Sequence, residues 1–157
     1  MIWAAVVLGV GIAGTLDEVV FHQLLRWHHF YDRSGAAVAL ITDGIFHLVS
    51  TGAIVLGGLL LWQRWRSAPL DGRRVWGSIL AGAGAFNLYD GVVQHKVLRL
   101  HQVREGVANE TPYDVVFIGV ALLVFVAGLA LARRRSGEPE RGGAGASAAD
   151  STPRRQR

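Results

Sequence analysis

Long apolar segments separated by short polar ones set the organisation of this chain. The apolar runs cover about residues 2–25, 37–62, 76–99 and 113–132. A hydrocarbon core about 30 Å thick is crossed by roughly 20 helical residues, and each run reaches about that length. The pattern therefore predicts an all-α fold, a bundle of four transmembrane helices within residues 1–135.

Composition changes this picture only at the C-terminus. Residues 136–157 are rich in Gly, Ala, Ser and Arg and hold no apolar run, so we expect a disordered basic tail there. Hydrophobic residues make up 51% of the whole chain, which is high for a water-soluble domain of this size. The net charge of +4 comes largely from the tail and from the loop after residue 62. No basic face interleaved with aromatic residues is present, which argues against nucleic-acid binding.

Arginine placement predicts how the bundle is oriented. Arginines lie between the second and third apolar runs and directly after the fourth: Arg64, Arg66, Arg73, Arg74, Arg133, Arg134 and Arg135. By the positive-inside rule these regions are cytoplasmic, which places both termini in the cytoplasm. Arginine-rich and almost lysine-free composition is typical of bacterial genes of high GC content. We therefore expect a multi-pass protein of a bacterial inner (plasma) membrane, surrounded by the lipid bilayer.

A sequence repeat relates the two halves of the apolar region. The segment DEVVFHQLLRWH at residues 17–28 recurs as DGVVQHKVLRLH at residues 90–101, with seven of twelve positions identical. In the helices that follow, DGIFH at Asp43 pairs with DVVFI at Asp114. A duplicated two-helix unit inserts twice in the same direction, so the halves should be related by a pseudo-twofold axis along the membrane normal. The expected pseudo-symmetric hairpins are repeat 1 at about 2–62 and repeat 2 at about 76–132.

Asp and His side chains fall at one depth of the predicted bundle, in its outer half, when the helical rise of 1.5 Å per residue is applied. A carboxylate near the bilayer centre costs about 3 kcal/mol on insertion scales, so such residues normally face the bundle interior and find a partner. The chain has no cysteine, and imidazole with carboxylate suits Zn, Fe, Mn or Cu(II). The sequence therefore predicts a metal site, whose expected ligands are His22, His47, His95, Asp17, Asp43 and Asp90.

Two further groups of residues surround this predicted site. If the helices continue outward, His28, His29 and His101 lie about one and a half turns beyond His22 and His95, as an outer tier at the mouth of the bundle. The residues that border the aspartates and could hydrogen-bond them are Asp114, Asn87 and Tyr113. No known metal-bundle motif such as HExxH is present, so haem between paired histidines, structural hydrogen bonds between helices and a proton relay all stay open.

Four segments carry a resemblance to a known family: GTLDEVVFHQLLRWHH, DGIFH, GAGAFNLYDGVVQHKVLRLHQVR and YDVVF. Over about residues 2–132 the chain resembles an uncharacterised family of bacterial four-helix membrane proteins, domain of unknown function 2243. The resemblance implies no established activity. Members are sometimes associated with cytochrome oxidase assembly proteins, which implies, by analogy only, copper or haem handling with such membrane proteins as partners. A membrane oxidoreductase with a metal or haem centre is the alternative, so enzymatic activity is left open.

Overall fold

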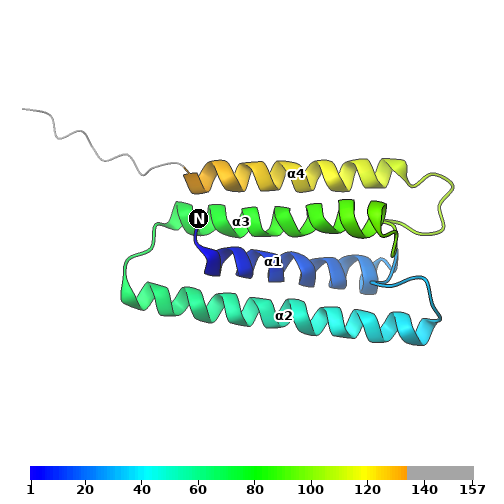
Figure 1. Cartoon of the computed structure of the whole chain (residues 1–157), viewed down its shortest axis with the longest axis horizontal. Helices are drawn as coiled ribbons and strands as arrows, with labels where there is room; N and C mark the ends of the chain where they lie inside the picture. Colours follow the sequence, from blue (N-terminus) through cyan, green and yellow to red (C-terminus); the bar gives the residue numbers. More distant parts are fainter. Residues whose placement is uncertain (134–157) are drawn as a thin grey trace, which may run out of the picture.

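The computed structural model describes residues 1–133, and within them all regular structure is helical (Figure 1). The helices are α1 (Trp3–Asp17), η1 (Glu18–Leu24), α2 (Ala36–Ser67), α3 (Gly72–Tyr89), η2 (Asp90–Val97) and α4 (Thr111–Arg133). The π-helices η1 and η2 continue α1 and α3 without a break, so the chain forms four rods. The predicted all-α four-helix bundle is confirmed, and the tail expected at residues 136–157 lies outside the described residues.

The two rods that carry π-helical ends lie inside the row of four. α1 packs against α2 and α3, and α3 packs against α4, so α2 and α4 are the outer rods (Figure 1). The N-terminus, the α2–α3 connection and the end of α4 lie at one end of the bundle. The connections at residues 25–35 and 98–110 lie at the opposite end, where the π-helices finish.

Large apolar side chains cover the outside of this bundle. Leu40, Leu48 and Leu123 are largely exposed, whereas the buried apolar residues among the described ones are alanines and Val103. Such an outer surface suits lipid. The rod α1–η1 and helices α2 and α4 are long and apolar enough to cross a membrane. The fourth rod, α3–η2, is more polar because η2 carries buried polar residues, and it packs between α1 and α4.

Glycines let the inner helices α1 and α3 approach backbone to backbone. A Cβ atom at Gly9 would collide with the carbonyl group of Ile79, and one at Gly82 would collide with that of Val6. Any side chain at these two positions would push the helices apart, because neither obstacle is a side chain that can rotate away. The close crossing brings the ends of the two inner rods together, and the polar residues with them.

Candidate metal centre

Each inner rod ends in the same unusual turn. The backbone of Arg26 and of Arg99 is left-handed, with φ of 51° at both residues. In the first turn the amide of Trp27 donates to the carbonyl of Phe21 at 2.9 Å, and the second turn has a matching bond. Left-handed backbone is uncommon for residues other than glycine and often marks a functional constraint. These turns stop the helices and send the chain back towards the bundle.

The turns carry His28 and His101 into the protein interior. Their exposed fractions are 3% and 2%, so the expected outer tier is wrong for both residues. The prediction assumed that each helix continues at a constant rise up to these histidines, whereas the helices end at Leu24 and Val97 and the chain reverses direction. His29 remains partly exposed, with 41% of its side chain accessible.

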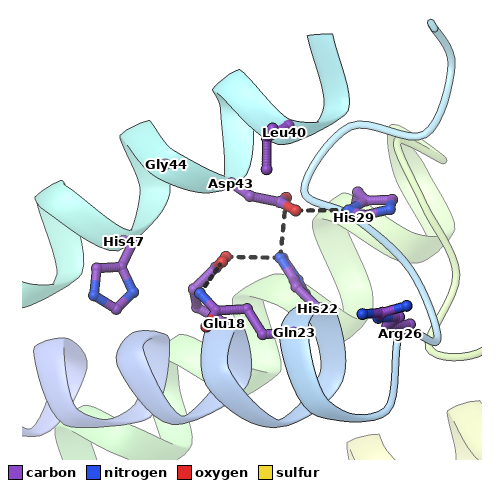
Figure 2. A pocket seen from close by; sticks show the side chains of 9 residues that line it. All are labelled: Glu18, His22, Gln23, Arg26, His29, Leu40, Asp43, Gly44 and His47. Atoms are coloured by element: carbon purple, nitrogen blue, oxygen red, sulfur yellow. Dashed lines mark hydrogen bonds and ion pairs between the residues drawn. The ribbon is translucent and has the colours of Figure 1, made fainter. Parts of the chain in front are cut away.

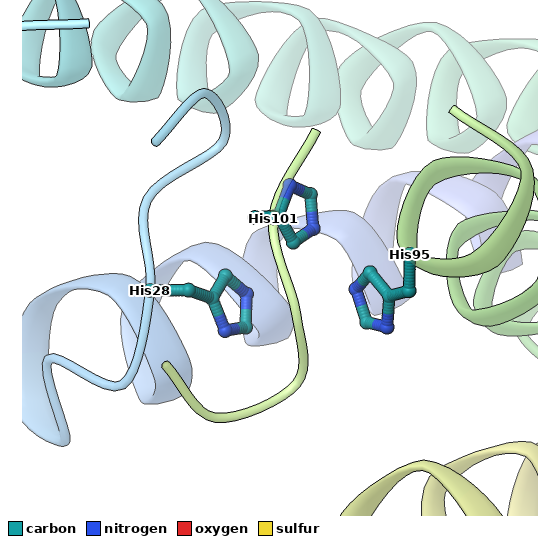
Figure 3. A group of neighbouring side chains, drawn as sticks. All are labelled: His28, His95 and His101. Carbon is teal, nitrogen blue, oxygen red and sulfur yellow. The ribbon is translucent and has the colours of Figure 1, made fainter. Parts of the chain in front are cut away.

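Four buried imidazoles meet at this end of the inner rods. The ring centroid of His28 lies 4.6 Å from those of both His22 and His101. The ring of His95 lies 4.6 Å from that of His101. Figure 3 shows His95 projecting from η2 towards His101 and His28, which come from the two loops. The four rings, together with two buried aspartates described below, are termed the central cluster: His22, His28, His95, His101, Asp17 and Asp90.

Backbone carbonyl groups hold two of these rings in a defined tautomer. Nδ1 of His28 donates to the carbonyl of Val103 at 2.9 Å, and Nδ1 of His101 donates to the carbonyl of Phe30 at 2.9 Å. Because a carbonyl can only accept, the proton is on Nδ1 and the lone pair is on Nε2. Both Nε2 atoms are buried and have no hydrogen-bond partner. Metal-binding histidines usually show this arrangement, with one nitrogen anchored and the other free.

The protonation state of His28 also suits a ligand. Burial, together with the nearby imidazoles of His101 and His22, lowers the pKa of His28 to about 2, against an opposing effect of the Val103 carbonyl. The ring is therefore neutral at physiological pH. A histidine must be neutral to bind a metal, so His28 needs to release no proton before binding one.

Each half of the chain adds one aspartate to the central cluster. Asp17 Oδ2 lies 3.4 Å from His22 Nε2, and Asp90 Oδ2 lies 3.0 Å from His95 Nε2. Asp90 Oδ1 lies 3.6 Å from Nε2 of His101. With metal–ligand bonds of about 2.1 Å, neighbouring ligands are about 3.0 Å apart in octahedral and about 3.4 Å apart in tetrahedral geometry. The observed separations are therefore close to those of ligands on a common metal ion.

Other contacts between the halves also come in matched pairs. The amide of Glu105 donates to the carbonyl of Trp27 at 2.9 Å, and the amide of Asp32 donates to that of Leu100 at 3.3 Å. These residues occupy equivalent positions in the alignment of the two sequence segments. The duplication of the chain itself stays a prediction from the sequence.

Two of the predicted ligands, Asp43 and His47, lie beside the central cluster in a separate pocket (Figure 2). This side pocket has a volume of about 490 Å³ and lies between η1, α2 and the first loop. Its polar lining includes Glu18, His22, Arg26, His29, Asp43 and His47. Asp43 accepts a hydrogen bond from the amide of Phe30 at 2.7 Å and lies 2.6 Å from Nδ1 of His29. Asp43 thus anchors the loop that carries His28.

Glu18 is a residue of this region that the sequence interpretation missed. It is only 1% exposed, and its Oε2 lies 2.8 Å from Nδ1 of His22. Its Oε1 accepts a hydrogen bond from Gln23 at 3.0 Å. The available signal was a second charged residue directly after Asp17 in an apolar run, because buried charges in membrane helices are rarely accidental.

The residues expected to surround the ligands have other neighbours. Asp114 forms an ion pair with Lys96, whose long side chain reaches it where the first half has the shorter Gln23. The hydroxyl of Tyr113 accepts a hydrogen bond from Arg104 at 2.6 Å. Both placements differ from the expected hydrogen bonds to the cluster. Asn87 lines a small cavity that Asp17 also borders.

These observations define a class, the helical membrane proteins that bury a histidine and aspartate cluster at one end of the bundle. The profile of a family described as predicted membrane protein, domain of unknown function 2243 (DUF2243), matches residues 4–135. The chain belongs to this family, which confirms the resemblance seen in the sequence. No curated protein and no solved structure matches the chain. Its function has therefore to be inferred from the site.

Proposed function

We propose that this protein is a membrane metalloprotein that holds a first-row transition metal in the central cluster. Each half would supply one aspartate and two histidines, Asp17, His22 and His28 from the first and Asp90, His95 and His101 from the second. This ligand set suits Fe, Zn, Mn or Cu(II). The observation that carries the proposal is the pair of buried, unpartnered Nε2 atoms on His28 and His101, whose Nδ1 atoms are anchored.

The geometry favours an ion over haem. The rings of His28 and His101 stack directly, with centroids 4.6 Å apart and planes inclined by 7°. Axial histidines would need a porphyrin between them, and these rings leave no room for one. A purely structural role for the cluster would leave buried nitrogen atoms unpaired, at a cost of about 1–3 kcal/mol each. A bound ion removes that cost.

Burial favours a resident centre over a site that passes metal to a partner. A delivery protein for oxidase assembly would need exposed, exchangeable ligands, whereas all six residues of the central cluster are buried. The side pocket reaches His22 from the protein surface. An open approach to a buried centre is what a membrane oxidoreductase would require, so we favour that role over copper or haem handling.

Metal content is the direct test of the proposal. Protein purified in detergent without chelators should contain stoichiometric Fe, Zn, Mn or Cu by mass spectrometry of the elements, and its optical spectrum should show no haem absorption. A preparation that contains no such metal and takes up none on titration would rule the proposal out. Stoichiometric haem would replace the ion with a different cofactor and would also contradict it.

We propose further that the protein lies in a bacterial inner membrane with both ends in the cytoplasm. The N-terminus, the α2–α3 connection with the arginines of the adjoining helix ends, and the end of α4 share one end of the bundle, which supports the positive-inside assignment (Figure 1). Reporter fusions after Arg66 and after Arg133 should both report cytoplasm, and one inserted at Gly106 should report periplasm. The reverse pattern would place the central cluster at the cytoplasmic side.

A further inference from the structure

Three of the four histidine and glutamate residues that line the side pocket are present on only one half of the pseudo-symmetric bundle. The other half has a pocket at the equivalent place, beside Lys96, Asp114 and Ile118. These three residues of the side pocket are replaced at the equivalent positions of the other half, where Gly91 matches Glu18, Gln102 matches His29 and Ile118 matches His47. The space beside Gly91 is filled there by Phe117 and Ile118. Glu18, His29 and His47 are therefore residues that the first half has in addition to its share of the central cluster.

Negative charge accumulates around His22 in this pocket. Glu18 Oε2 and Asp43 Oδ1 lie 2.8 and 3.2 Å from the same nitrogen, Nδ1 of His22. One nitrogen carries at most one proton, so it can donate a full hydrogen bond to only one of these carboxylates. Asp17 adds a third carboxylate on the other side of the ring, 3.4 Å from Nε2.

Among the described residues, no Lys or Arg side chain forms an ion pair with these three carboxylates. All three are buried, and the groups in contact with them that can take up a proton are His22 and His29, whereas Arg26 lines the pocket but is exposed. In the other half the counterpart of Asp43, Asp114, is paired with Lys96, but the matching residue in the first half is the neutral Gln23. Buried carboxylates of this kind need protons or a cation as compensation.

We propose that the side pocket is a second, exchangeable site for a divalent cation, with Glu18 and Asp43 as carboxylate ligands and His47 as a nitrogen ligand. The ligand atoms of Glu18, His22 and Asp43 lie within 4.8 Å of one another. A further atom points to a missing ligand, because His47 Nδ1 is buried without a hydrogen-bond partner. Glu18 Oε2 is buried as well, and its neighbour at 2.8 Å, Nδ1 of His22, is shared with Asp43. Figure 2 shows His47 reaching from α2 towards the space beside Glu18.

The chemistry of the site indicates which ion it binds, and its position indicates that this ion can exchange with the solvent. Two carboxylates with one imidazole form a harder ligand set than the histidine-rich central cluster, which favours Mn²⁺ or Fe²⁺ over Cu²⁺. Arg26 and Gln23 at the pocket are exposed, so water reaches the site from the end of the bundle. The ring of His22 lies between the two sites, with Nδ1 facing the pocket and Nε2 facing Asp17 of the central cluster.

Titration of the purified full-length protein with Mn²⁺ tests this site, with free Mn²⁺ followed by its electron paramagnetic resonance signal. Wild-type protein should bind one Mn²⁺ per chain that EDTA removes. Asp43→Asn should weaken this binding by at least about tenfold, and Asp114→Asn at the equivalent position should leave it unchanged. His47→Ala should weaken it in the same way, with Ile118→Ala as its control, because half-exposed His47 can be replaced with less risk to folding.

This titration tests the side-pocket site separately from the proposed metal of the central cluster, because binding of Mn²⁺ in the pocket does not require that metal. Exchangeable Mn²⁺ that is lost in Asp43→Asn and His47→Ala supports the side-pocket site, even if no retained metal is found by elemental analysis. No Mn²⁺ binding by the wild type overturns it, even if a retained metal is present. Equal binding by Asp43→Asn, His47→Ala and the wild type also overturns it.

Discussion

His101→Ala is expected to lower the retained metal content of the purified protein by more than about tenfold, since even changes beyond the direct ligands of a metal site cost 10- to 100-fold in affinity. The substitution removes a buried Nε2 that faces the central cluster and the Nδ1 contact with Phe30 that orients it. His28→Ala should have an equally large effect, because His28 makes the equivalent contact with Val103. Elemental analysis of protein purified from membranes measures both.

The matched control for these variants is His29→Ala. His29 is adjacent to His28, but its side chain is 41% exposed and contacts Asp43 instead of the central cluster. The retained metal should stay within about twofold of the wild type in this variant. If His101→Ala keeps its metal while His29→Ala loses it, the ligands are not those of the central cluster.

Gly82→Val is expected to prevent the bundle from folding stably. The added side chain would occupy the position of the Val6 carbonyl group, and a backbone atom on a neighbouring helix cannot move aside alone. Overpacking usually costs about 1–3 kcal/mol, and a clash with backbone should exceed that range. Thermal unfolding in detergent, followed by circular dichroism, should show a large loss of stability together with loss of the retained metal.

Gly58→Ala is the control for this substitution, because nothing lies within 4 Å of a Cβ atom built at Gly58. Alanine is favoured over glycine inside a helix by about 1 kcal/mol, so this variant should be as stable as the wild type or slightly more stable. Wild-type stability in Gly82→Val would show that α1 and α3 do not cross as closely as described here.

The helices of the site could be predicted from the sequence, but the loops of the site could not. Asp17, His22, Asp90 and His95 are on continuous helical rods, so the rise per residue placed them at one level, and the structure brings them together. His28 and His101 follow the turns at Arg26 and Arg99. The direction of the chain after such a turn depends on contacts with the other half of the chain. The residue spacing along one helix carries no information about those contacts.

Similar sequence also did not ensure similar surroundings. Asp43 and Asp114 are at matching positions, yet Asp43 holds the first loop through His29 and Phe30, whereas Asp114 is paired with Lys96. Each aspartate forms a hydrogen bond or an ion pair with the groups of other elements that lie within reach. A few changes between the halves, among them Gln23 against Lys96, therefore separate a polar pocket on one side from an ion pair on the other.

The sequence by itself determined the class of this protein, because helix length, apolar content and the cost of burying charge in a membrane are properties of each segment. It also identified most of the histidines and aspartates that make up the site. Only the tertiary structure decided which of them share a site, because that depends on the close crossing of α1 and α3 and on backbone carbonyls of each loop that anchor a histidine of the other. Those contacts join residues far apart in the chain, and they turn two similar helical ends into one buried cluster.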